Sequence, residues 1–224
     1  MRKGIGKMNK IIIDTLTKNV KWYKIYEITQ WDKIFQNVDK KLQKKKLNYA
    51  KVSAAELKSL EEKDGNIPLY TTGLFDAKTI EITAKNFINN DEVITIPDGR
   101  ANIRYINGKF VITDHNKLCK SFDKNIVSTK YIYYFFKNKN IEIQSFYTGA
   151  APQSCDMNKL LNLQIPIPPL EIQNKIVSVL DKFSELEAEL GKELQLRKKQ
   201  YEYYRNKLLS FDKEKEMGGS GFLR

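Results

Sequence analysis

The sequence predicts an α+β protein, in which a domain with a mostly antiparallel, twisted sheet and short helices precedes one long, coiled-coil-forming helix. Short apolar runs separated by Gly, Asn and Asp turns fill residues 67–113, a pattern typical of antiparallel strands. After Pro168 and Pro169 the apolar residues change to helical spacing and keep it to Leu208. A chain of 224 residues can bury one core and carry one extension.

This division gives four segments. Residues 1–17 form a basic lead or tether, residues 18–164 the globular domain, and residues 165–211 the long helix. Residues 212–224 include a Gly-rich stretch that resembles a linker or a flexible tail, so we leave them out of the fold.

Positive charge is concentrated at the front of the chain. The formal net charge is +12, from 39 Lys and Arg against 27 Asp and Glu. Residues 1–51 alone hold 14 basic and 4 acidic side chains, so they carry most of the excess. Such a block is typical of contact with a polyanion, above all nucleic acid, and the alternative is a solvated face.

The first part of the domain contains short helical elements. Trp22, Ile25 and Ile28 have helix-like spacing, which predicts a short element that packs its Trp and Ile into the domain. Residues 39–51 are rich in lysine and form either a loop beside phosphates or a solvated helix face. Residues 52–64 have a helical composition and end at an Asp-Gly-Asn turn.

The central part of the domain is the predicted sheet. Strands are expected at residues 67–75 (passing into a polar loop), 78–83, 92–97, 103–106 and 109–113. Asn107-Gly108 separates the last two and is a strong hairpin signal. The turn that follows Pro97 displays Arg100 and Asn102, and Asp114-His115 ends the sheet.

The last part of the domain combines a helix with shorter elements. Residues 128–137 predict a largely buried helix, whose aromatic side chains favour a core over a base-stacking platform. Residues 141–146 predict a strand, residues 147–154 a loop of small and hydrogen-bonding side chains, and residues 156–161 a short helix.

The long helix carries a seam for a partner helix. Pro168 and Pro169 favour a helix start just after them, and Glu171 suits the positive end of the helix dipole. The seam consists of Ile176, Val179, Phe183, Leu186, Leu190, Leu194 and Tyr201, continuing through Tyr204 and Leu208. Its steps of three and four residues, with one slip before Leu194, indicate a coiled coil with a stutter. A rod of roughly 60 Å needs another helix along it.

The residues needed for common enzyme chemistry are missing. The single histidine, His115, and the two cysteines, Cys119 and Cys155, form no triad or metal-ligand spacing, and no Gly-rich phosphate loop is present. We therefore expect no catalytic residue, no metal and no cofactor, and free thiols in a reducing compartment. Without a signal-like start or an apolar run of eighteen residues, the expected location is the cytoplasm and no membrane is involved.

The start of the long helix resembles a known family. Ile165–Gln173 (Ile-Pro-Ile-Pro-Pro-Leu-Glu-Ile-Gln), residues 176–181 and residues 197–209 resemble the conserved helical region of the specificity subunits of type I restriction-modification systems. Residues 22–28 and 67–73, Asp114-His115 and the loop at 149–153 are similar to that family's target recognition domain. The resemblance covers roughly residues 18 to 210.

The resemblance implies a half-length specificity subunit with one target recognition domain and one helical region, where full subunits have two of each. Two copies, or this chain and a second half, would then pair through antiparallel helices, and a homodimer is the expected form. The implied function is sequence-specific recognition of a bipartite target in double-stranded DNA. The implied partners are methyltransferase subunits, which methylate adenine N6, and motor-nuclease subunits, which restrict unmodified DNA.

Within this resemblance, residue chemistry suggests the DNA contacts. Arg100 suits guanine and Asn102 or Gln153 suits adenine, although each is also an ordinary turn or surface residue. The residues expected to contact DNA are Lys44, Lys45, Lys46, Tyr70, Thr71, Thr72, Arg100, Asn102, Arg104, Thr148, Gln153 and Ser154.

Other classes of protein stay open at this point. They are a stand-alone DNA-binding or assembly-decoy protein, the detached recognition part of a fused restriction enzyme, and a coiled-coil adaptor. The basic front argues against the adaptor. The DNA sequence recognised and the choice between homodimer and heterodimer depend on loop geometry and on the partner.

Overall fold

The computed structural model describes residues 20–210, except 37, 45 and 74–76. The predicted lead at 1–17, the tail at 212–224 and Lys45 therefore lie outside the described residues. The chain divides into two compact units, Met1–Val177 and Ser178–Arg224. None of the helices in the described part has the length and apolarity needed to cross a membrane.

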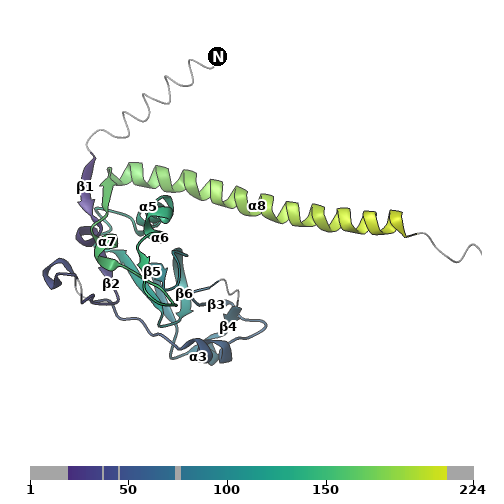
Figure 1. The fold of residues 1–224 in the computed structure, drawn as a ribbon, viewed down its shortest axis with the longest axis horizontal. Coiled ribbons are helices and arrows are strands. Elements are labelled where there is room, and N and C mark those ends of the chain that lie inside the picture. Colours follow the sequence, from purple (N-terminus) through teal and green to yellow (C-terminus); the bar gives the residue numbers. More distant parts are fainter. Residues whose placement is uncertain (1–19, 37, 45, 74–76, 211–224) are drawn as a thin grey trace, which may run out of the picture. The chain divides into compact units, whose positions relative to one another are not determined.

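A six-stranded sheet forms the centre of the first unit (Figure 1). Its order is β2 (Thr29–Trp31), β7 (Asn116–Ser121), β5 (Asn89–Pro97), β6 (Arg104–Ile112), β3 (Ile67–Tyr70) and β4 (Ala77–Thr79). All neighbours are antiparallel except β3 and β6, which run parallel. The prediction of a mostly antiparallel sheet with short helices is therefore confirmed.

Two small ribbons and several short helices complete this unit. β1 (Lys21–Lys24) pairs with β10 (Gln164–Ile167), and β8 (Tyr147–Thr148) pairs with β9 (Ser154–Cys155). The helices are α2 (Ile25–Ile28), α3 (Ala54–Ser59), α4 (Glu81–Ala84), α5 (Thr129–Asn138), α6 (Asn140–Gln144) and α7 (Met157–Leu161), with a 3₁₀ turn, η1 (Lys40–Leu42). Ser53, Ser128 and Asp156 cap α3, α5 and α7 through their side-chain oxygens, which accept backbone N–H groups of the first turn.

The core follows from the apolar runs of the central strands. Ile94 and Ile96 of β5 lie in a cluster with Ile132 and Phe136 of α5, and Figure 1 shows α5 beside β5. A second cluster, around Leu57 of α3, covers the β3 and β4 end of the sheet. The predicted helices at 52–64, 128–137 and 156–161 are present as α3, α5 and α7.

Asn107-Gly108 does not form the predicted hairpin. Both residues lie inside the continuous strand β6, where they pair with Glu92 and Asp91 of β5. Gly108 has a φ of +116°, which a glycine adopts without the strain that a Cβ would cause. The chain reverses instead at residues 98–103, so the two predicted short strands are one strand.

Other predicted elements also differ. The strand expected at 78–83 ends at Thr79 and α4 follows, and the strand expected at 141–146 is helix α6. The sheet does not end at Asp114-His115, since β7 follows directly. The described residues of 39–51, which leave out Lys45, form no helix beyond η1, and this is consistent with the loop alternative.

The prediction that Trp22 packs into the domain is wrong. Trp22 lies on β1, pairs with Pro166 and is 63% exposed, whereas Ile25 and Ile28 of the next element are buried as expected. Backbone pairing with β10 gives this segment strand geometry, in which neighbouring side chains point to opposite sides.

Helix α8 (Leu170–Leu209) begins directly after Pro168-Pro169, as predicted. Gln173 in its first turn is fully buried. Its Nε2 donates to the carbonyls of Ile126 (2.9 Å) and Pro168 (2.8 Å), and its Oε1 accepts from Ser128 N (3.0 Å). One amide side chain thus joins the beginning of α8 to the segment that leads into α5.

Candidate nucleic-acid interface

The turn between β5 and β6 presents Arg100. Gly99 has a φ of +94°, and Asn102 N donates to Arg100 O (2.7 Å), so the chain folds tightly around this residue. Arg100 is exposed. A guanidinium at the tip of a tight turn can make paired hydrogen bonds to a base edge.

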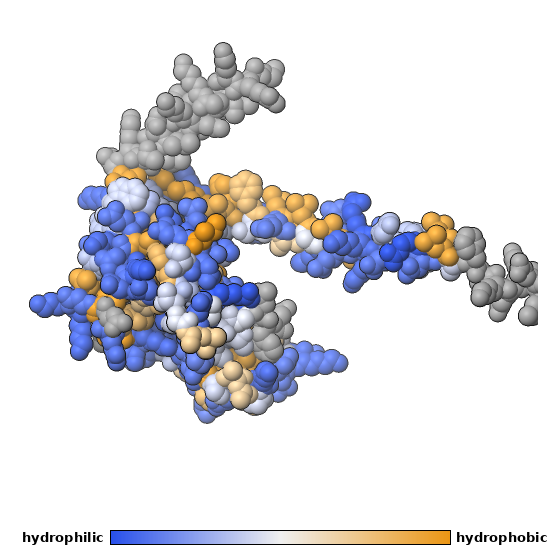
Figure 2. All heavy atoms as spheres, viewed as in Figure 1, coloured by the Kyte–Doolittle hydropathy of each residue, from blue (hydrophilic) through white to orange (hydrophobic). Residues whose placement is uncertain are grey.

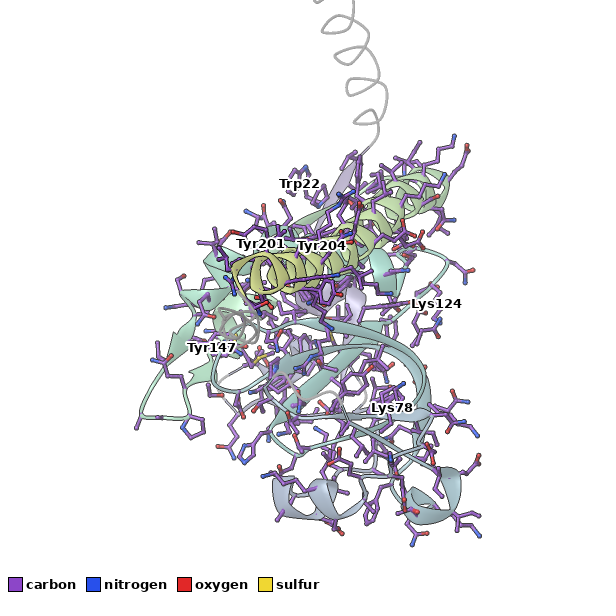
Figure 3. All side chains as sticks on the ribbon, turned by 90° about the vertical axis from the view of Figure 1, so that its right-hand side faces the viewer. Trp22, Lys78, Lys124, Tyr147, Tyr201 and Tyr204 are labelled. Carbon is purple, nitrogen blue, oxygen red and sulfur yellow. The ribbon has the colours of Figure 1, made fainter. Side chains whose placement is uncertain are left out.

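The β8–β9 hairpin lies against this turn and presents Thr148, Gln153 and Ser154. Gly99 N donates to Gln153 O (2.6 Å). At the base of the hairpin, the hydroxyl of Tyr147, which is labelled in Figure 3, donates to Pro97 O (2.7 Å). Arg100 and Gln153, which are far apart in sequence, are therefore carried by adjoining loops.

A buried charged group lies where the two loops meet. Lys117 of β7 forms an ion pair with Asp98, and its ammonium also donates to Ser154 Oγ (3.2 Å). Ser154 Oγ in turn donates to Asp98 Oδ1 (2.9 Å), which closes the triangle. Burial raises the pKa of Asp98, but the hydrogen bond and charge of Lys117 outweigh it and hold the pKa below its ordinary value.

Two further groups converge on the same place. His115 Nδ1 lies 3.6 Å from Asp98 Oδ2, and the backbone of His115 accepts from Asp98 N (2.9 Å). Lys33 Nζ donates to Asp114 O (3.0 Å). The Asp114-His115 pair noted in the sequence thus supports the end of β5 where the Arg100 turn begins.

Arg104 holds a second loop beside the first. Its guanidinium donates to Thr71 O (2.7 Å) and to Gly73 O, and it lies 5.9 Å from the centre of the Tyr70 ring. Burial lowers the pKa of Arg104, and the charge of Arg100 acts in the same direction. Arg104 supports the loop, while Arg100 is free to reach outward.

The structure thus brings together two groups of the predicted residues, namely Arg100, Thr148, Gln153 and Ser154, and next to them Tyr70, Thr71, Thr72 and Arg104. Asn102 is placed differently, because its amide nitrogen is buried without a hydrogen-bond partner among the described residues. Asn102 lines a cavity of about 280 Å³ with Arg100 and with Asn140 and Gln144 of α6.

The predicted lysines lie apart from these loops or outside the described residues. Lys44 Nζ lies 4.6 Å from the centre of the Phe122 ring, just beyond the end of β7 opposite to Lys117. Lys46 is exposed and lines a small cavity with Lys33 and Lys51. Lys45 lies outside the described residues.

Sequence reasoning missed the roles of Asp98 and Lys117. The sequence alone gives no signal for them, because the burial of all four residues of Asn116–Cys119 is known only from the structure. A charged residue at such a position needs a partner. Asp98, at the end of the neighbouring strand, is that partner.

The described residues of this unit include neither a cluster suited to a metal ion nor an activated thiol. Among the described residues, no group of three or more His, Cys, Asp or Glu side chains is placed to hold a metal ion. Cys119 and Cys155 are free and buried, and burial raises the pKa of Cys155 to about 12, so neither thiol is activated.

Helix α8 exposes an apolar stripe along the second unit. Val179, Phe183, Leu186, Leu190 and Leu194 are each more than half exposed, and hydrophobic side chains recur along α8 in Figure 2. Tyr201 and Tyr204, labelled in Figure 3, continue the stripe toward the C-terminal end. Ile176 differs, because it is partly buried against the core of the first unit.

Comparison with known proteins shows which family has this architecture. A family model for the type I restriction modification DNA specificity domain matches residues 47–196, more than half of the chain. The chain belongs to this family. The matched segment of the specificity domain includes the loops around Arg100 and Gln153 and the first part of α8.

Individual relatives agree with this assignment. A Haemophilus influenzae protein named as a type I restriction enzyme specificity subunit is 34% identical over 185 residues, which are 75% of this chain and 46% of that protein. The specificity subunit of the Escherichia coli type I restriction enzyme EcoR124I/EcoR124II is 40% identical over 93 residues, which are 39% of this chain and 23% of that protein. This chain thus spans about half the length, or less, of these two relatives.

A solved structure supports the fold. The type I restriction-modification S subunit from M. genitalium matches with a TM-score of 0.59 and 19% identity, over 88% of this chain and 48% of that chain. At this level of identity the likeness concerns the fold of the specificity domain.

Proposed function

We propose that the chain is a sequence-specific DNA recognition subunit of a type I restriction-modification complex. The observation that carries the proposal is the pair of adjoining loops that present Arg100 and Gln153. Arginine can bind the O6 and N7 of guanine, and glutamine the N6 and N7 of adenine, in the major groove. Two such side chains on neighbouring loops could address adjacent base pairs.

The surroundings of these loops suit a polyanion. Thr148, whose side chain is exposed, can donate a hydrogen bond to a phosphate oxygen. Lys46 is exposed, and residues 1–51 contribute 14 of the 39 basic side chains of the chain. In this proposal the lysines give affinity that falls with salt, and the loops give specificity.

The apolar stripe of α8 suits a second helix. A row of half-exposed leucines at coiled-coil spacing is unfavourable in water unless it is covered. The proposed cover is α8 of a second copy in antiparallel orientation, which would place a recognition domain at each end and give a bipartite DNA target. The paired helices would also bind methyltransferase subunits for adenine N6 methylation and, through them, motor subunits for restriction.

The recognition proposal is tested by selection from a library of duplexes with randomised sequence. The full chain is expected to enrich a defined motif, and Arg100→Ala is expected to lose preference at one base pair of it. Arg205→Ala, which removes an exposed arginine of α8, is the matched control and should enrich the full motif. No enrichment by the unaltered chain would refute sequence-specific recognition.

Pairing is tested separately by light scattering at micromolar concentration, where a dimer is expected and a stable monomer would contradict the proposal. Co-expression with methyltransferase subunits and mapping of methylated adenines then distinguishes two forms. A bipartite palindrome indicates a homodimer, and two unlike half-sites indicate a second, different chain.

A further inference from the structure

We propose that Asp98, Lys117 and Ser154 form a clamp that fixes the Arg100 turn against the β8–β9 hairpin and so sets base specificity without touching DNA. The proposal rests on the proposed function, because it concerns how the two recognition loops are held. Its members are positioning residues, each from a different part of the chain: the end of β5, the strand β7 and the hairpin strand β9.

The clamp is a closed set of interactions. Lys117 pairs with Asp98 and donates to Ser154 Oγ (3.2 Å), and Ser154 Oγ donates to Asp98 Oδ1 (2.9 Å). The side chains of Lys117 and Asp98 are only 8% and 16% exposed. Each of the three side chains therefore contacts both of the others.

Stability alone does not explain why Lys117 and Asp98 form an ion pair at this buried position. Removing an ammonium and a carboxylate from water is costly, and apolar residues of similar volume often stabilise a protein equally well. In this proposal the ion pair adds a single preferred geometry. Here that geometry fixes a loop connection, since the only other described hydrogen bonds between the two segments are Gly99 N to Gln153 O and Tyr147 Oη to Pro97 O.

The geometry bears on recognition because paired hydrogen bonds to a base tolerate little displacement. Contacts of the kind that Arg100 and Gln153 can make need both loops held within a fraction of an ångström. With the clamp broken, each loop would move independently of the other. The affinities for cognate and non-cognate DNA would then become more similar.

A direct phosphate contact by Lys117 is the competing explanation, and the structure argues against it. Both partners of its ammonium are protein groups, and the side chain is nearly inaccessible. The two explanations differ in their salt dependence. A lost phosphate contact lowers the slope of binding against salt concentration by about one, whereas a lost clamp leaves that slope unchanged.

The experiment compares Lys117→Met with a matched control, Lys120→Met. Lys120 lies on the same strand and is also ion-paired with an aspartate of β5, Asp91, but at the other end of that strand. Both variants of the full chain are assayed for thermal stability and for enrichment from the randomised duplex library. Enrichment is measured at several salt concentrations.

We expect Lys117→Met to lower the preference for the selected motif by about tenfold, with an unchanged salt slope. Lys120→Met should keep the preference despite a comparable loss of stability. If Lys117→Met kept the full preference, or if its salt slope fell by about one, the clamp would be refuted. Equal loss of preference in the two variants would also refute it, because general destabilisation would then be the cause.

Ser154→Ala provides a second route if Lys117→Met fails to fold. Ser154 is exposed, so the substitution leaves the core intact while removing one side of the triangle. Its expected effect is a smaller loss of preference that is not additive with Asp98→Asn, because both act through the same set of contacts. Additive or absent effects would refute the clamp. No enrichment by the unaltered chain would refute the proposed function and the clamp together.

Discussion

Replacing Gln173 by alanine should uncouple the start of α8 from the domain and destabilise the protein strongly. Gln173 is fully buried and makes three hydrogen bonds, to Ile126 O, Pro168 O and Ser128 N. Alanine has no group that can replace them. All three partners belong to the backbone of the surrounding segments.

The size of the effect follows from this count. A buried hydrogen bond contributes a net of about 0.5–1.5 kcal/mol, and each buried partner left unsatisfied costs about 1–3 kcal/mol. Since relaxation and water entry recover part of this, we expect a loss of about 3–5 kcal/mol in the free energy of unfolding. That is a large share of the total stability of about 5–15 kcal/mol typical of such domains.

Urea unfolding followed by tryptophan fluorescence measures this change, because Trp31 is buried in the core. Gln200→Ala, at an exposed position of α8, is the control and should change stability by less than about 0.5 kcal/mol. Gln173→Glu refines the test. It keeps the acceptor for Ser128 N but turns a carboxylate oxygen toward two carbonyls, so part of the lost stability should return as the pH falls and the carboxyl is protonated. A loss below about 1 kcal/mol for Gln173→Ala would refute the reasoning.

Three further outcomes are expected. Leu190→Lys should convert the proposed helix pair to monomers in light scattering, because each copy of the pair loses the burial of one leucine and gains a charge in the seam, and a persisting dimer would contradict the seam. The pKa of Asp98 is lower in the folded than in the unfolded protein, so its ionised form stabilises the fold at any pH above its ordinary pKa. This stability is lost as the pH falls through the folded pKa. Lys117→Met should weaken this acid dependence, measured as the unfolding midpoint below about pH 4. Arg104→Lys should speed hydrogen exchange of Gly73, because an ammonium cannot reach two carbonyls as the guanidinium fork does, and unchanged exchange would show that the loop holds itself.

Local sequence signals correctly predicted the elements whose structure depends mainly on neighbouring residues. The Pro168-Pro169 start of α8 and the length of the helix follow from backbone restriction and apolar period, and both are confirmed. Asn107-Gly108 carries an equally local signal that failed. Pairing with Glu92 and Asp91 keeps the strand continuous through a glycine that can adopt a positive φ, so a long-range ladder overrode the turn preference.

Two elements, β7 and α6, have sequence patterns that did not indicate the observed structure. β7 was missed because Asn116–Cys119 is buried throughout and shows no alternation of polar and apolar residues. For α6, the alternation of Ile141 and Ile143 with polar neighbours predicts a strand where the structure has a helix. In the structure Ile141 is 90% exposed and Ile143 is buried. Two residues are too few to distinguish a period of two from a period of 3.6.

The candidate site was predictable as residue types but not as an arrangement. Arg100 and Gln153 stood out because turns display long polar side chains, yet only the tertiary hydrogen bond between Gly99 and Gln153 puts their loops together. Arg104 was expected to contact DNA, and its guanidinium is used to hold the loop at Thr71. Whether it also reaches DNA stays a prediction.

The basic front of the chain also looks different once partners are known. Lys51 is paired with Asp32 and donates to the carbonyl of Asn116, and Lys33 donates to the carbonyl of Asp114. These two lysines thus contact residues 114–116, the segment that precedes and begins β7. Charge used in this way cannot release counterions from DNA. The salt slope of binding should therefore be smaller than the basic count of residues 1–51 suggests, and a slope matching that full count would mean that these internal contacts break when DNA binds.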